Sequence, residues 1–64
     1  MDVTDKANLE GISEYDVFRI AYRSTFPDRP DRPDEVESDF GYYLNTGEIP
    51  GYVSYYLNGV ELEA

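Results

Sequence analysis

Closely spaced prolines set the strongest limit on how this chain can fold. Residues 28–34 read Asp-Arg-Pro-Asp-Arg-Pro-Asp, and Pro27 stands just before them. Proline lacks the amide hydrogen that a helix interior needs, and its ring clashes with the preceding turn, so no regular helix can pass through this segment. We therefore expect a stiff, extended linker whose alternating Asp and Arg side chains lie in solvent. A Pro-rich ligand for a small recognition domain is the alternative interpretation.

A helix is predicted before the linker, from about residue 13 to residue 25. Ser13 can cap its amino end, because a serine hydroxyl accepts a hydrogen bond from an amide of the first turn. Pro27 follows its carboxyl end, where proline commonly stops a helix. Residues 1–12 show no comparable pattern, and we expect them to form an extended or irregular arm. The apolar residues at helical spacing are Val17, Phe18, Ile20, Ala21 and Tyr22.

Two further helices are predicted after the linker, from about residue 34 to 45 and from about 50 to 57. Pro33 suits the first turn of the earlier helix, and Gly47 supplies a left-handed residue at which it can stop. The sequence thus predicts a mostly α fold, a small three-helix domain with an extended Pro-rich linker, as one domain over residues 1–64. The apolar stripes of the two helices are Val36, Phe40, Tyr43 and Leu44, and then Ile49, Val53, Tyr56 and Leu57.

The C-terminal half also admits a strand interpretation. Residues 40–44 and 53–57 contain apolar residues in alternation, and the Asn-Gly pair at 58–59 is a strong hairpin signal. On this interpretation the chain is α+β, with one helix packed on a three-stranded antiparallel meander. Pro50 counts against it, because proline cannot donate a hydrogen bond inside a central strand. Residues 60–63 alternate as well, as a short strand or tail does.

Charge is distributed unevenly along the chain. The sequence has 14 acidic residues and five basic ones, which gives a net charge of −9 at pH 7. All the basic residues lie in the first half, whereas residues 34–64 carry seven acids and no base. Such a charge repels nucleic acids and anionic membranes and attracts basic surfaces. Five of the seven tyrosines lie in the same half, so we expect a surface there that is both acidic and rich in tyrosine.

The residue types behind most catalysis and metal binding are missing. The chain has no histidine, the commonest general base and metal ligand, and no cysteine for a disulfide or thiol chemistry. Asp28, Asp31 and Asp34 recur at every third position, but arginines stand between them and the pattern of a calcium-binding loop is absent. We expect no catalytic residue, no metal and no cofactor.

Two explanations of the acidity remain open. The acids can serve solubility or salt adaptation in a small structural or regulatory interaction domain. Alternatively, carboxylates on a rigid surface can imitate the phosphates of a nucleic acid and occupy a basic groove. The absence of Lys and Arg after Arg32 favours mimicry, because solubilising surfaces usually mix both signs.

In size, charge and class the chain resembles phage-encoded inhibitors of host defence, such as anti-CRISPR and anti-restriction proteins. This resemblance implies a non-enzymatic inhibitor, a nucleic-acid mimic that acts in the host cytoplasm. No apolar run approaches the roughly 20 residues that span a bilayer, and the first ten residues are polar and acidic, unlike a secretory signal. We therefore expect a cytoplasmic protein.

The predicted partner is a protein with a basic nucleic-acid-binding groove, and we expect no direct contact with nucleic acid or membrane. Tyr43 and Tyr56 share the apolar stripes and are expected in the core. The remaining tyrosines of this half are expected at the surface, where tyrosine brings a large contact area at low entropic cost. The predicted partner-binding residues are Asp34, Glu35, Glu37, Asp39, Glu48, Tyr42, Tyr52 and Tyr55.

Overall fold

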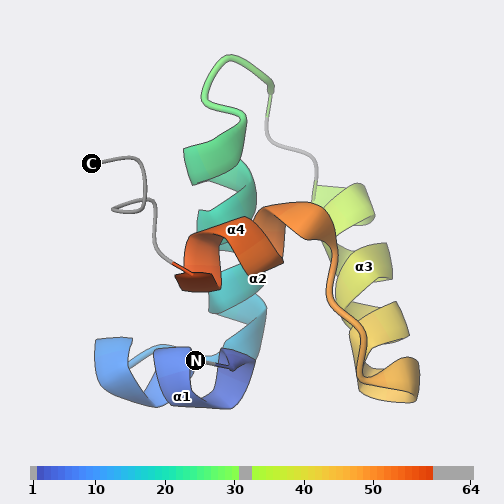
Figure 1. The fold of residues 1–64 in the computed structure, drawn as a ribbon. Helices are drawn as coiled ribbons and strands as arrows, with labels where there is room; N and C mark the ends of the chain where they lie inside the picture. The colour runs from blue at the N-terminus through green and yellow to red at the C-terminus, as the bar shows by residue number, and fades with distance from the viewer. Residues whose placement is uncertain (1, 31–32, 59–64) are drawn as a thin grey trace.

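A computed structural model describes residues 2–30 and 33–58 of this protein. These residues form four α-helices: α1 (Val3–Glu10), α2 (Glu14–Thr25), α3 (Pro33–Thr46) and α4 (Gly51–Asn58) (Figure 1). The described part of the chain contains no strand, so the prediction of a mostly α fold is confirmed and the meander alternative is wrong. The strand or tail predicted at residues 60–63 lies outside the described residues, as does Gly59 of the hairpin signal.

The N-terminal segment that was predicted to be an irregular arm is helix α1, so the three-helix count is wrong. Asp2 caps this helix, and its carboxylate accepts a hydrogen bond of 2.8 Å from the amide of Asp5. Gly11 ends the helix with a left-handed φ of 72°. Only Val3 and Ala7 of α1 are buried. One pair of residues a turn apart is too short a pattern to distinguish a helix from an irregular arm.

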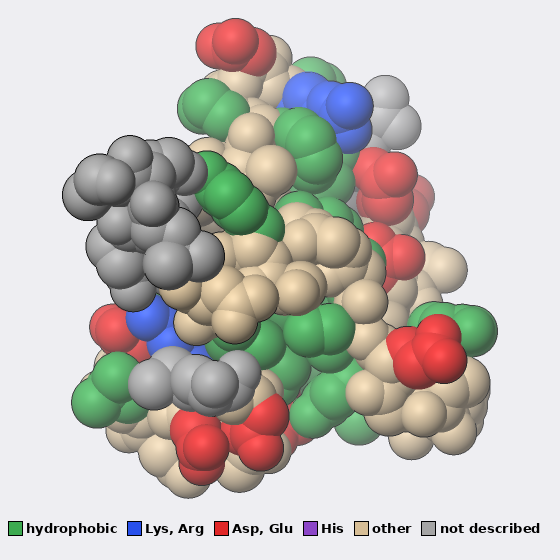
Figure 2. Space-filling model, viewed as in Figure 1, with side chains coloured by type: hydrophobic (Ala, Val, Ile, Leu, Met, Phe, Trp, Pro, Cys, Tyr) green, Lys and Arg blue, Asp and Glu red, His purple; other side chains and the backbone are tan. Residues whose placement is uncertain are grey.

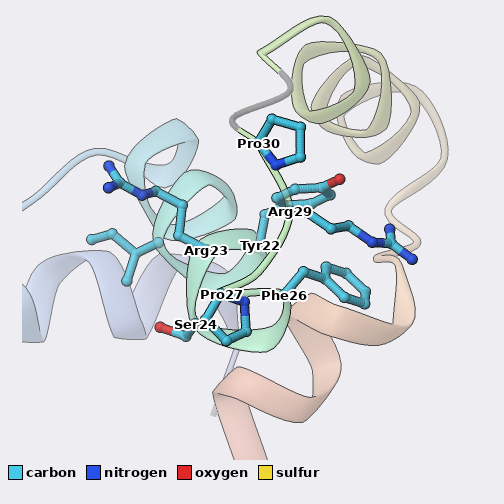
Figure 3. A pocket seen from close by; sticks show the side chains of 8 residues that line it. Tyr22, Arg23, Ser24, Phe26, Pro27, Arg29 and Pro30 are labelled. Atoms are coloured by element: carbon cyan, nitrogen blue, oxygen red, sulfur yellow. The ribbon is translucent and has the colours of Figure 1, made fainter.

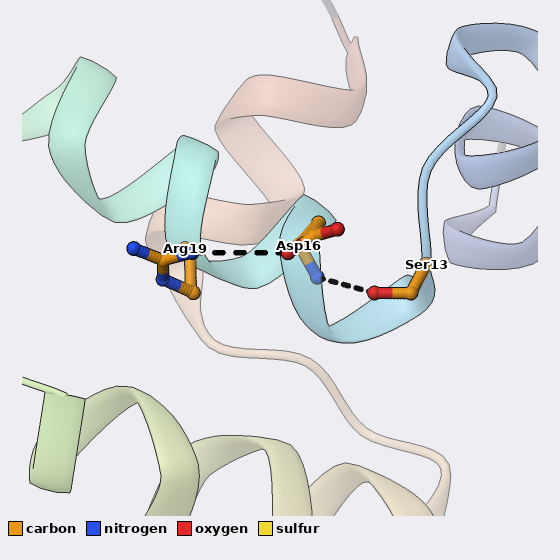
Figure 4. A network of polar contacts seen from close by, with 3 residues as sticks. All are labelled: Ser13, Asp16 and Arg19. Carbon is orange, nitrogen blue, oxygen red and sulfur yellow. Dashed lines mark hydrogen bonds and ion pairs between the residues drawn. The ribbon is translucent and has the colours of Figure 1, made fainter.

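Helix α2 begins and ends as predicted, but the segment after it does not extend. The Ser13 hydroxyl accepts a 3.1 Å hydrogen bond from the amide of Asp16, whose carboxylate lies 3.8 Å from the Arg19 guanidinium (Figure 4). After α2 the chain turns, and the amide of Arg29 donates a 3.1 Å hydrogen bond to the carbonyl of Phe26. The prediction of an extended linker is therefore wrong for the described part of this segment.

Helices α3 and α4 lie close to their predicted ranges. Pro33 is the first residue of α3, and Gly47, with φ 82°, follows its last residue, both as expected. The carbonyl of Pro50 accepts hydrogen bonds of 3.1 Å from the amides of Val53 and Ser54, which start α4. Proline at this position supplies the carbonyl that the helix start needs while its missing amide hydrogen costs nothing.

Helix α2 is the element on which the other three helices pack. In Figure 1, α1 lies across one end of α2, α4 crosses in front of its middle, and α3 stands beside it. The buried residues of the described chain come from all four helices. They are Val3, Ala7, Val17, Phe18, Ala21, Tyr22, Val36, Val53 and Leu57.

Aromatic rings on α2 join it to both of its later partners. The ring of Phe18 lies 5.3 Å from that of Phe40 and 5.4 Å from that of Tyr43, measured between centroids, so this group links α2 to α3. One turn later, the ring of Tyr22 meets Tyr52 of α4 edge-on at 5.3 Å. The contacts of Phe18 with Phe40 and of Tyr22 with Tyr52 are edge-to-face, which is favourable for aromatic rings at these distances, and they help to hold α3 and α4 on α2.

Two residues of the predicted apolar stripes lie at the surface. Leu44 on α3 is 64% exposed, and Ile20 on α2 is 38% exposed. The other predicted stripe residues are buried or pack against the core.

Candidate functional site

The acidic residues predicted to bind a partner gather on and just after α3. Asp34, Glu35, Glu37 and Asp39 belong to α3, and Glu48 lies in the loop that follows it. The described segment 33–58 contains no lysine or arginine. Figure 2 shows Asp and Glu side chains spread along the side of the molecule that α3 forms. In the same view, one group of Lys and Arg atoms lies near the loop after α2, and another lies beside α1 at the lower left.

Two of these carboxylates accept hydrogen bonds from tyrosines of the neighbouring helices. The hydroxyl of Tyr22 on α2 donates a 2.9 Å bond to Glu35, and the hydroxyl of Tyr52 on α4 donates a 2.7 Å bond to Asp39. Glu35 and Asp39 are four residues apart, so they lie on the same side of α3 at the edge of its buried stripe. The structure therefore brings these two predicted residues together in fixed positions.

No lysine or arginine among the described residues forms an ion pair with either carboxylate. The ion pairs among residues 2–30 and 33–58 lie within α1 and within α2. A tyrosine hydroxyl is a neutral donor, so it orients the carboxylate and leaves its negative charge in place. Glu35 and Asp39 thus present ordered charges that have no counter-charge on the described protein.

Tyr52 departs from its prediction, because it is half-buried rather than exposed. Its ring packs against Tyr22, and its hydroxyl faces Asp39. Burial, and then the hydrogen bond to Asp39 and the charges of Asp39 and Glu35, raise the pKa of Tyr52 well above its ordinary value. The hydroxyl therefore remains a neutral donor through the physiological range.

The other two acids of α3 lie on its outward side. Asp34 and Glu37 are exposed, and their side chains have no hydrogen bond or ion pair to another described residue. Leu44 shares this side of the helix, two turns further along, and is largely exposed. The predicted acids therefore form two groups on α3: an ordered pair beside α2 and α4, and a solvated pair on the outward side.

The remaining predicted residues lie at the carboxyl end of α3 and on α4. Tyr42 is 57% exposed, and its hydroxyl lies 3.4 Å from the carboxylate of Glu48, a long hydrogen bond. The amide of Glu48 donates a 3.1 Å bond to the hydroxyl of Thr46, which holds the loop against the end of the helix. Tyr55 on α4 is 46% exposed. The exposure predicted for Tyr42 and Tyr55 is confirmed.

The tyrosine donors of Glu35 and Asp39 were not predicted from the sequence. A partial signal was available, because each of these acids directly precedes a residue of the α3 stripe. A residue in that position borders the buried face and can meet a side chain from the next helix. Which side chain it meets depends on how α2 and α4 dock, and the stripe pattern does not specify that.

The described residues hold no group of three or more His, Cys, Asp or Glu side chains arranged to bind a metal ion. Across ranges 2–30 and 33–58, every helix is too short or too polar to cross a membrane. Comparison with models of protein families, with curated proteins and with solved structures finds no match to this chain.

Proposed function

We propose that this protein is a non-enzymatic inhibitor, of the phage counter-defence type, that occupies the basic nucleic-acid-binding groove of a host protein with its α3 face. The observation that supports this most is the pair of carboxylates, Glu35 and Asp39, that neutral hydroxyls hold in place without neutralising them. Solubility requires charge on a surface, but it does not require that the charge be ordered.

Order in these carboxylates favours binding. A flexible acidic side chain loses rotamer freedom when it meets a cation, at a cost of about 0.5–1.5 kcal/mol for each side chain immobilised. Tyr22 and Tyr52 restrict Glu35 and Asp39 before any partner arrives. The entropy lost on association is therefore smaller than for carboxylates that move freely in solvent.

The spacing on α3 also suits phosphate mimicry. Residues four apart on a helix have Cβ atoms about 5–6 Å apart, a separation similar to that of successive phosphates along a nucleic-acid strand. Asp34 and Glu37 add charge that steers the protein toward a positive surface. Leu44 and Tyr42 are exposed on the same helix and supply apolar contact area.

A displacement experiment tests this proposal. Nucleic-acid-binding proteins from a lysate of the host are loaded on immobilised DNA and eluted with the purified protein at low salt. We expect the parent to release a specific protein from the DNA. The double variant Glu35→Gln with Asp39→Asn removes two charges but keeps oxygens that can accept the tyrosine hydrogen bonds, and it should release at least about tenfold less.

A matched control separates position from total charge. The double variant Asp5→Asn with Asp28→Asn removes the same number of charges from exposed positions on α1 and in the loop after α2. It should release as much protein as the parent does, and thermal melting checks that each variant is folded. If both double variants act alike, or if the folded parent releases nothing, the mimic proposal fails. A structural or regulatory interaction domain, acidic for solubility or salt adaptation, is then the better explanation.

A further inference from the structure

A groove of about 480 Å³ lies at the carboxyl end of α2 and along the turn that follows it (Figure 3). Its walls are about equally polar and apolar and include two prolines, which keep the turn stiff. Two guanidinium groups border it, on opposite sides in Figure 3. The apolar part of the wall includes Ile20, Phe26, Pro27 and Pro30, and the two cations are Arg23 and Arg29.

The basic residues at this groove differ from the other described basic residues in their ion pairing. Among the described residues, Lys6 is paired with Glu10 and Arg19 with Asp16. Arg23 and Arg29 are exposed and form no ion pair with a described residue. In a chain with 14 acids and five bases, acidic partners are plentiful. The guanidiniums of Arg23 and Arg29, which have no ion pair to a described residue, border the same groove.

The guanidinium of Arg29 is held in a position that suits an incoming carboxylate. It stacks over the ring of Phe26, 4.1 Å from the centroid. Stacking uses the flat face of the guanidinium and leaves its N–H edges available, and these edges match both oxygens of a carboxylate. The backbone hydrogen bond from the amide of Arg29 to the carbonyl of Phe26 fixes the turn that carries both residues.

We propose that this groove binds a short acidic segment of a partner protein, in which an aliphatic residue lies between two carboxylates. The aliphatic side chain packs on Ile20, Pro27 and Pro30, and the carboxylates meet Arg23 and Arg29 at the two sides. A short peptide brings only two charges toward this acidic protein, whereas a nucleic acid brings many and is repelled more strongly. This second surface lies on α2 and its following turn, and it does not depend on the function proposed for α3.

Titration of the isotopically labelled protein with a blocked peptide, followed by the shifts of backbone amide signals, tests the proposal. The probe is the pentapeptide Gly-Glu-Leu-Glu-Gly, and its matched control is Gly-Gln-Leu-Gln-Gly. We expect saturable shifts confined to residues 20–30, and weaker binding as salt rises. The glutamine peptide should bind at least about tenfold more weakly, because hydrogen bonds between charged groups are lost.

Matched arginine variants locate the binding. Arg23→Gln and Arg29→Gln should each weaken binding of the acidic peptide by about tenfold. Arg19→Gln should leave it unchanged, since Arg19 lies on the same helix but is paired with Asp16. The dispersion of the amide signals shows whether each variant is folded. If loss of the stack on Phe26 unfolds Arg29→Gln, the Arg23 and Arg19 variants together with the two peptides still decide the question.

Several outcomes overturn this proposal. They are the absence of shifts at millimolar acidic peptide, shifts confined to α3, and equal binding of the two peptides. A further outcome is tighter binding of a single-stranded oligonucleotide of five nucleotides than of the acidic peptide. That result assigns the groove to phosphates of a nucleic acid instead.

Discussion

The hydroxyl of Tyr52 on α4 lies 2.7 Å from a carboxylate oxygen of Asp39 on α3 and donates a hydrogen bond to it. These two helices pack mainly on α2 rather than on each other. The bond therefore joins two elements that have little other contact, and it does so at a group that the proposed partner surface uses. The same hydrogen bond therefore contributes to the stability of the fold and holds the Asp39 carboxylate in position.

The substitution Tyr52→Phe should lower the free energy of unfolding by about 1–2 kcal/mol, because it removes a hydrogen bond to a charged acceptor and keeps the ring in its packing against Tyr22. Urea unfolding followed by circular dichroism measures this change. Tyr42→Phe is the control, since its hydrogen bond is long and exposed, and it should change stability by less than about 0.5 kcal/mol. Equal effects of the two substitutions would mean that the Tyr52–Asp39 bond contributes nothing measurable.

Alkaline pH should destabilise the fold through Tyr52. Burial, together with the hydrogen bond to Asp39, raises the pKa of Tyr52 in the folded protein above its value in the unfolded chain. Above a pH of about 10 the unfolded chain loses this proton while the folded protein retains it, so the free energy of unfolding falls as pH rises. Unfolding in urea at a series of pH values between about 9 and 11 measures the slope.

The Tyr52→Phe variant supplies the control for this pH dependence. It lacks the titrating group, so its stability should fall less steeply than that of the parent over the same range. A slope that is the same in both proteins would show that other groups cause the alkaline loss.

Alanine at two glycines should change stability in opposite directions. Gly11 has φ 72°, and nothing lies within 4 Å of a Cβ added there, so Gly11→Ala costs only backbone strain, about 1–2 kcal/mol. Gly41 lies within α3 and has equal space around an added Cβ, so Gly41→Ala should stabilise the helix by about 0.5–1 kcal/mol. Thermal melting compares the two. A neutral Gly11→Ala would contradict the left-handed end of α1.

Added salt should raise the melting temperature. A net charge of −9 resides on a body whose principal extents are 32 × 27 × 20 Å. The screening length falls from about 30 Å at 0.01 M salt to about 3 Å at 1 M, so repulsion across the molecule is present at low salt and removed at high salt. An unchanged melting temperature would show that the charges do not repel across the fold. A protein that folds only in molar salt would support the salt-adaptation alternative.

The sequence predicted the helices whose ends carry distinct signals and missed the one whose apolar face is small. Ser13 and Gly47 mark the start of α2 and the end of α3, and both act as expected. Asp2 and Gly11 give α1 similar ends, but between them only two residues reach the core. The most apolar side chain of that helix, Leu9, is 68% exposed, so its hydrophobicity indicated nothing about packing.

The candidate site was predicted in part for a related reason. Acidity along residues 34–48 follows from composition, and the location of those acids on and after α3 agrees with the expected helix. The burial of Tyr52 does not follow, because it depends on a contact with Tyr22, which lies thirty residues earlier in the chain. The spacing of apolar residues along one helix identifies its inner face. Which side chain each of these residues contacts depends on how the other helices dock.

The central position of α2 has a consequence for how this chain can change over generations. Helices α1, α3 and α4 each have their main packing surface on α2 and little on one another. A substitution on the inner face of one of these helices therefore calls for a compensating change on α2 and not on the other two. Lineages should accumulate paired replacements between α2 and each neighbour separately, so that α3 can diverge while α1 and α4 keep their sequences.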